Sequence, residues 1–199
     1  YEIINSNENN YSGKYNWGIT TSQSYLPIDN HEFFNKDLSL VEWLREWATT
    51  EEEREEVYLR GFLGEMVFSG EEALKTCNVL SGGEKVRCML SRMMMFRANV
   101  LMLDEPTNHL DIPTIEWLEK WLQGYNGAIL LVTHDRSFLQ NVATNIAELD
   151  RGSLYQFDGS FEKFLIFREQ QLAAEETANK LFDKKLADFL LYTTDSPKD

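Results

Sequence analysis

The sequence predicts an α/β domain built on a parallel sheet, followed by a long C-terminal helix. The central observation is a short apolar run, Val100–Leu103, that leads directly into Asp104 and Glu105. Such a run is typical of a strand buried on both faces of a parallel sheet. A second apolar run, Ile129–Val132, follows a helical segment, and from Ser160 the apolar residues recur at helical spacing.

Composition and charge restrict the class of protein. The chain has 199 residues and is 43% hydrophobic, which predicts a folded domain with an extension. It contains no apolar run of membrane-spanning length and opens with no secretory signal, so we expect no membrane insertion and a cytoplasmic location. Cys77 and Cys88 lack metal or redox spacing and are expected to be reduced thiols. The net charge of −14 argues against direct RNA binding by the chain as a whole.

The first part of the chain contains one candidate strand. Residues 1–15 are polar and rich in asparagine. The segment Trp17–Leu26 alternates weakly between polar and apolar residues, which is compatible with a strand. Pro27 then ends it.

Capping patterns predict two helices after this strand. Ser39 and Glu42 have the spacing of a capping box that opens a helix ending near Ala48. Thr50 and Glu53 repeat that spacing directly before a second helix. The acidic first turn of the second helix suits the helix dipole, and its charged residues are expected to face solvent.

A glycine-rich segment opens a third predicted helix, which runs from Ser81 to about Arg97. Ser81 and Glu84 again have capping-box spacing, so one interpretation is only a well-capped helix. The other interpretation is a phosphate site, because a helix N-terminus exposes N–H groups and Gly82 and Gly83 let the backbone approach an anion. The acidic strand end and the histidine further along favour phosphate binding.

Asp104 and Glu105 emerge at the carboxyl end of a parallel strand, where such sheets bind ligands. Burying two adjacent carboxylates is costly unless a cation or a proton shares the site. Asp104 therefore suits a ligand of nucleotide-bound Mg²⁺, direct or through water, and Glu105 suits a base for the attacking water. An ordinary strand followed by an acidic turn is the alternative, and it would be preferred for an isolated Asp-Glu pair.

The next elements follow from helix and strand signals. Pro113 suits the first turn of a helix that runs through Trp117 and Trp121. Ile129–Thr133 is predicted to be the next buried strand. His134 follows at its tip, close to the expected position of Glu105, where an imidazole can sense a γ-phosphate. A structural role is the usual one for a lone histidine.

The last part of the chain is predicted to contain a hairpin and the long helix. Arg136–Val142 has the pattern of a short helix, and an edge hairpin is expected to turn at Arg151 and Gly152. One long helix then runs from Ser160 to about Tyr192.

Three motifs in this order resemble those of the ATP-binding cassette ATPases. They are Leu80–Glu84, the acidic strand, and Val132–Asp135. The amino-acid sequence of the segment Glu105–Asp111 is similar to that of the ABC-F family. These are soluble cassette proteins known chiefly as ribosome-associated translation factors and antibiotic-resistance proteins. The resemblance spans about 12–189, most of the chain.

The resemblance implies a P-loop NTPase-like fold, with a cassette domain over residues 1–159 and a linker-like helix and tail over 160–199. Within the cassette it implies an α-helical subdomain over about 38–97. It also implies ATP and Mg²⁺ as cofactors, with a second cassette as partner and the ribosome as partner of the full-length protein. The implied catalytic residues are Glu105 and His134. The implied ATP-binding residues are Ser81, Gly82, Gly83, Glu84, Asp104, Asp111 and Gln23, and Asp104 is also the implied Mg²⁺ ligand.

Two departures from the family pattern limit this reading. The phosphate loop G-x-x-x-x-G-K-[ST] does not occur, since Ser12–Tyr15 lacks the first glycine and the hydroxyl after the lysine. We therefore expect a cassette that is incomplete at its N-terminus and inactive as this isolated chain. The glutamine that follows the first strand in the family has Gln23 as its only local candidate. Direct alignment puts Ile28 there instead, and a solvent-facing role for Gln23 stays open.

Three functions are therefore compatible with the sequence. The first is an ABC-F cassette that hydrolyses ATP at an interface with a second cassette, coupled to translation. The second is an ATPase subunit of a membrane transporter, which Asn108-His109 and the long C-terminal helix disfavour. The third is a non-enzymatic interaction fragment that keeps the signature face and the long helix.

Overall fold

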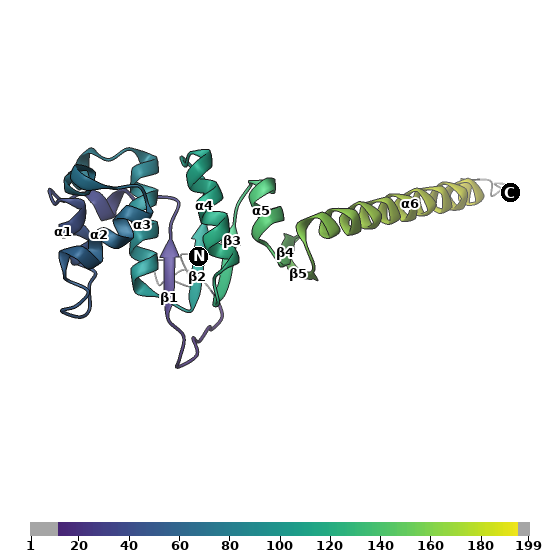
Figure 1. The fold of residues 1–199 in the computed structure, drawn as a ribbon. Helices are drawn as coiled ribbons and strands as arrows, with labels where there is room; N and C mark the ends of the chain where they lie inside the picture. Colours follow the sequence, from purple (N-terminus) through teal and green to yellow (C-terminus); the bar gives the residue numbers. More distant parts are fainter. Residues whose placement is uncertain (1–11, 195–199) are drawn as a thin grey trace. The chain divides into compact units, whose positions relative to one another are not determined.

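The computed structural model describes the backbone of residues 12–194 and the side chains of residues 12–185. These residues form two compact units, the first ending at Asp135 and the second beginning at Arg136 (Figure 1). The predicted sheet lies in the first unit and the predicted long helix in the second.

A parallel sheet of three strands forms the centre of the first unit, with the strand order β1-β2-β3. The strands are β1 (Gln23–Leu26), β2 (Val100–Asp104) and β3 (Ala128–Val132). Together with the helices around it, this sheet confirms the predicted α/β class.

The β2 strand is the buried centre of the sheet. Leu101, Met102 and Leu103 each expose at most 1% of their surface, as predicted. The prediction that β3 is also buried was wrong, because Leu130 and Val132 are both 46% exposed. The physical reason is position: among the described strands, β3 pairs with β2 alone and so lies at the sheet edge.

Helices follow and separate these strands in the first unit. The α-helices are α1 (Leu40–Arg45), α2 (Glu56–Glu65), α3 (Gly82–Phe96) and α4 (Ile112–Gln123). The short 3₁₀ segments are η1 (His31–Phe34), η2 (Gly70–Leu74) and η3 (Cys77–Val79). In Figure 1, α1, α2 and α3 lie on the β1 side of the sheet, and α3 contacts β1.

The region of α1, α2 and α3 has an aromatic core of its own. Phe34 and Trp43 are each 1% exposed and stack with ring centroids 4.8 Å apart. Trp43 Nε1 donates to the carbonyl oxygen of Phe33 at 2.7 Å. The Arg92 guanidinium lies 3.8 Å from the ring centroid of Trp47, a cation–π contact, and burial lowers the pKa of Arg92 to about 10.

Two of the predicted helix starts are confirmed by their capping boxes. At α1, the Ser39 hydroxyl accepts from the amide of Glu42, whose carboxylate accepts from the amide of Ser39. The same reciprocal pair forms between Ser81 and Glu84 at the start of α3. Each box satisfies two amides that would otherwise lack a partner at the first helical turn.

The helix predicted directly after Thr50 begins only at Glu56, so that prediction was wrong. The hydrogen bonds between Thr50 and Glu53 do form, but the residues that follow them make turns. Arg45 donates from Nε to the carbonyl oxygen of Arg54 at 3.1 Å. That contact competes for a carbonyl that a continuous helix would use, and the repulsion between neighbouring glutamates weakens the first turn further.

The second unit consists of a short helix, a hairpin and one long helix. The elements are α5 (Arg136–Val142), β4 (Asn145–Asp150), β5 (Ser153–Asp158) and α6 (Phe161–Thr194). The antiparallel strands turn at Arg151 and Gly152, with φ of +49° and +79°, which confirms the predicted hairpin turn.

The α6 helix confirms the long helix predicted from Ser160. Its start is fixed to the hairpin by Arg168, which pairs with Glu148 at 3.0 Å and with Asp150 at 3.2 Å. Between Arg168 and Lys185 every described side chain is exposed. Among the described residues, neither α6 nor any other helix is long and apolar enough to cross a membrane.

Gly61→Ala is expected to stabilise the chain. Gly61 lies in the exposed middle of α2, and an added methyl group would meet no atom within 4 Å. Glycine costs about 0.5–1 kcal/mol relative to alanine in a helix, so the free energy of unfolding in urea should rise by about that amount. Gly152→Ala adds the same methyl group where φ is +79° and should instead lower stability by about 1–2 kcal/mol. Loss of stability in Gly61→Ala would contradict the assignment of an unstrained helix there.

Candidate functional site

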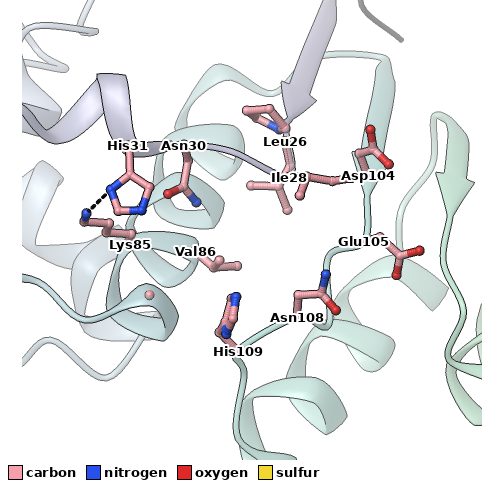
Figure 2. Close-up of a pocket in the computed structure, with 12 residues that line it drawn as sticks. Leu26, Ile28, Asn30, His31, Lys85, Val86, Asp104, Glu105, Asn108 and His109 are labelled. Carbon is pink, nitrogen blue, oxygen red and sulfur yellow. Dashed lines mark hydrogen bonds between the residues drawn. The ribbon is translucent and has the colours of Figure 1, made fainter.

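Three segments of the first unit meet at the carboxyl end of β2 and enclose a cavity of about 90 Å³ (Figure 2). They are the segment that follows β1, the first turns of α3, and the loop that follows β2. The lining residues are Leu26, Pro27, Ile28, Asn30, His31, Gly82, Lys85, Val86, Asp104, Glu105, Asn108 and His109. The cavity therefore lies where parallel sheets bind ligands.

Glu105 is held in one position by β3 and His134. Its amide donates to the carbonyl oxygen of Val132 at 2.8 Å, which extends the strand pairing beyond β2. One carboxylate oxygen accepts from the amide of His134 at 3.2 Å, and the other lies 3.4 Å from Nε2 of that histidine. The Glu105 side chain is 11% exposed and that of His134 98%. The structure thus brings the two predicted catalytic residues together.

The backbone at Glu105 is strained. Its φ is +48°, in the left-handed region, and His109 in the same loop has φ of +65°. Such a conformation costs about 1–3 kcal/mol for a residue other than glycine and persists where surrounding contacts impose it. Asp104, the last residue of β2, stays in the extended strand and lines the same cavity. Adjacent carboxylates are therefore turned in different directions by this change of backbone conformation (Figure 2).

The start of α3 is stabilised by charge. Glu84 accepts from the amide of Ser81 at 2.9 Å, and Lys75 Nζ lies 3.0 Å from its other carboxylate oxygen. The Ser81 amide and, less strongly, Lys75 lower the pKa of Glu84 to about 2, although burial opposes the shift. Ser81 and Glu84 thus have the capping role that the sequence offered as one interpretation, while Ser81 and Gly82 stay exposed.

The two glycines of this turn pack against the loop after β2. A methyl group on Gly83 would overlap the carbonyl oxygen of His109, whereas one on Gly82 would touch the His109 ring at 3.4 Å. The sequence explained these glycines by the approach of a phosphate. The structure supplies a further reason for Gly83, which is the close approach of another part of the same chain.

Of the predicted ATP-binding residues, Gly82 and Asp104 line the cavity, and Ser81, Gly83, Glu84, Asp111 and Gln23 do not. Asp111 caps α4, with Oδ1 accepting from the amide of Thr114 at 3.1 Å, and the hydrogen bonds from Thr114 lower its pKa. Gln23 is exposed at the amino end of β1, opposite Val100, and so lies at the sheet end away from Glu105. Ile28 lines the cavity instead, at the position that direct alignment gave to the family's glutamine.

Sequence reasoning missed several residues of the cavity wall. Asn30, His31, Lys85 and Asn108 carry polar groups and belong to elements that are far apart in the chain. Lys85 is one turn inside α3, only 9% exposed, and contacts His31 at 2.9 Å. The available signal was the spacing of Lys85 four residues after Ser81, which puts both on one side of the helix.

Gly83→Ala should destabilise the protein by about 1–3 kcal/mol, because the methyl group forces α3 and the loop at His109 apart. Gly82→Ala is the matched control, since the same methyl group would make an ordinary contact with the His109 ring. Urea unfolding of both variants measures the difference. Equal effects of the two substitutions would contradict the packing described for this turn.

Glu84→Gln should lower stability at neutral pH but not in acid. The folded-state pKa of Glu84, about 2, is below its usual value, so its stabilisation is present above about pH 4.5 and is lost as the pH falls toward 2. Urea unfolding at several pH values gives the free energy of unfolding of the variant and of the unaltered chain. The difference between these two free energies should become smaller below about pH 4.5. Glu116→Gln, an exposed change on α4, controls for net charge. A difference in unfolding free energy that does not vary with pH would contradict stabilisation by the ionised form of Glu84.

Comparison with known proteins agrees with this geometry. The family model described as "ABC transporter" matches residues 2–108. The chain is 48% identical over 166 residues to "Uncharacterized ABC transporter ATP-binding protein YkpA" of Bacillus subtilis (strain 168), covering 83% of this chain and 30% of YkpA. It is 43% identical over 119 residues to "Energy-dependent translational throttle protein EttA" of Mycobacterium tuberculosis (strain CDC 1551 / Oshkosh), covering 60% of this chain and 21% of EttA.

A solved structure shows the same fold. It is the complex of archaeal ribosomal stalk protein aP1 with the archaeal ribosome recycling factor aABCE1, with a TM-score of 0.63 and 19% identity, covering 83% of this chain and 33% of that chain. The chain thus spans less than a third of the two curated relatives. From the family match, the fold and these relatives, the chain belongs to the ABC transporter family and is a P-loop NTPase-like cassette ATPase of ABC-F type.

Proposed function

We propose that this chain forms part of a cassette that binds ATP with Mg²⁺ and hydrolyses it at an interface with a second cassette. The observation that carries the proposal is the contact of Glu105 with His134 at the carboxyl end of β2, beside Asp104. ATP hydrolysis by a cassette also requires a phosphate loop of the kind G-x-x-x-x-G-K-[ST], which does not occur in these 199 residues.

Glu105 suits the general base. Its carboxylate is 11% exposed, so little bulk water competes for it, and the amide of His134 fixes its orientation. A carboxylate in that position can take a proton from water as the water attacks the γ-phosphate. His134, with an exposed ring, suits contact with the γ-phosphate itself.

Asp104 suits a Mg²⁺ ligand, direct or through water. Among the described residues there is no group of three acidic, histidine or cysteine side chains that could hold a metal. Mg²⁺ commonly keeps several waters and takes only one or two carboxylates together with substrate phosphates. One carboxylate at the strand end therefore fits a Mg²⁺ that arrives with the nucleotide and neutralises phosphate charge.

The exposed start of α3 supports a role at the interface between cassettes. Ser81 and Gly82 are exposed, and the amide end of this helix carries partial positive charge. We propose that the residues Ser81, Gly82 and Gly83, with Glu84 holding the turn through its hydrogen bond to the Ser81 amide, bind the γ-phosphate of ATP held by the second cassette. Asp111, exposed at the cap of α4, would then face the same interface.

We further propose that ATP turnover is coupled to translation in the cytoplasm. The support is the relative EttA, whose name describes a translational throttle protein. In this proposal residues 1–159 belong to the cassette, with a helical subdomain over about 38–97, and residues 160–199 to a linker. The exposed α6 suits such a linker.

A second candidate, an ATPase subunit of a membrane transporter, is supported by the name of YkpA. Co-purification with ribosomes or with a permease separates the two.

Glu105→Gln, in the full-length protein, should abolish hydrolysis and leave ATP binding intact. The amide keeps the size and the hydrogen bond from His134 but cannot take a proton from water, so kcat should fall about 10²–10⁴-fold. Turnover measurements and nucleotide titration test this, with Glu116→Gln on the exposed face of α4 as the control. Near-normal turnover in Glu105→Gln would exclude Glu105 as the base.

A further inference from the structure

Lys85 and His31 meet at the cavity wall although 54 positions separate them in the chain. Lys85 Nζ lies 2.9 Å from His31 Nδ1 (Figure 2). Lys85 is only 9% exposed, whereas His31 is exposed. Among the described residues no acidic side chain forms an ion pair with Lys85, and the hydrogen-bond partner of its ammonium at this wall is an imidazole. A largely buried ammonium is costly unless its hydrogen bonds are made.

The chemistry of the two groups defines the state of His31. An ammonium has three donors and no acceptor, so His31 Nδ1 must accept the hydrogen bond. His31 is then neutral and carries its proton on Nε2. A proton on Nδ1 would remove the acceptor and place two cations 2.9 Å apart.

The contact fixes the segment that connects the sheet to the helical region. On one side Leu26, 1% exposed, anchors the segment in β1, and on the other side Phe34 anchors it against Trp43. Between them, Asp29 accepts from the amide of His31 at 2.9 Å and Ile28 is 63% exposed. The side-chain hydrogen bond from Lys85 to His31 therefore connects this segment to α3.

We propose that Lys85 and His31 are positioning residues for ATP hydrolysis. Their hydrogen bond holds residues 27–31 against α3, so that the wall facing Asp104 and Glu105 keeps one shape. An apolar pair could pack there without the cost of burying an ammonium. It would not fix the orientation of residues 27–31 relative to α3, because apolar contacts lack the directional geometry of a hydrogen bond. The inference rests on the proposed ATPase function and assigns neither residue to contact with ATP.

The first experiment tests the contact in this chain. Long-range ¹H–¹⁵N spectra report the ring tautomer of each of the three histidines. His31 should be neutral with its proton on Nε2. Lys85→Met should remove that fixed tautomer, while Lys120→Met, at an exposed position of α4, should leave it unchanged. A proton on Nδ1 of His31 in the unaltered chain, or a tautomer unaffected by Lys85→Met, would overturn the inference.

The second experiment tests the role in the full-length protein. Lys85→Met should lower kcat by up to about 10²-fold, the cost of misplacing reacting groups by about 1 Å, with KM for ATP changed by less than about twofold. His31→Leu should match it, and the double variant should be no worse than either single one. His31→Gln offers a carbonyl acceptor to Lys85 and should recover most of kcat.

The outcomes separate this inference from the proposed function. If the unaltered protein hydrolyses ATP and Lys85→Met keeps its kcat, the positioning role is wrong. If the unaltered protein shows no hydrolysis, the proposed function fails, and the role inferred from it fails too, while the spectra still decide the contact. Thermal unfolding identifies variants that do not fold. If Lys85→Met does not fold, the kcat of the two His31 variants is compared. A low kcat in His31→Leu together with a nearly unchanged kcat in His31→Gln supports the positioning role, and equal kcat values contradict it.

Discussion

Burial of β2 between two parallel neighbours is the constraint on which the rest of the first unit depends. Leu101, Met102 and Leu103 leave water almost completely, and burying such a side chain contributes about 1.5–3 kcal/mol. The register places Asp104 opposite Val132, so both carboxylates must emerge at the same sheet edge. Together these residues gain more than the about 1–3 kcal/mol that a left-handed Glu105 costs. The packing of β2 can therefore hold Glu105 in a strained backbone conformation.

The same strand explains why the start of α3 lies near the acidic loop. The helix ends at Phe96, the next residue Arg97 has φ of +46°, and β2 begins at Val100, so the chain reverses within a few residues. A helix of 15 residues rises about 22 Å and a strand of five about 17 Å, so the start of one comes back beside the end of the other. This return brings Gly83 against His109 and Lys85 to the cavity, and it requires a residue without a side chain at the closest approach.

Features that depend on near neighbours in the chain could be predicted from the sequence. The capping boxes at Ser39 and Ser81 involve residues three positions apart, and the hairpin turn depends on Arg151 and Gly152 alone. Even such local signals have limits. Thr50 and Glu53 make the predicted hydrogen bonds, yet the helix begins only at Glu56, because contacts from outside the segment decide whether a first turn continues.

The sequence by itself determined the α/β class, the buried central strand and the pairing of an acidic strand end with a histidine. These follow from apolar runs and from the rule that parallel strands end at one edge. Only the tertiary structure decided that β3 is half exposed, that Gln23 lies at the far end of β1, and that Lys85 reaches His31 across 54 positions. The physical reason is that periodicity gives the face on which a side chain lies, whereas the atoms opposite that face come from distant parts of the chain.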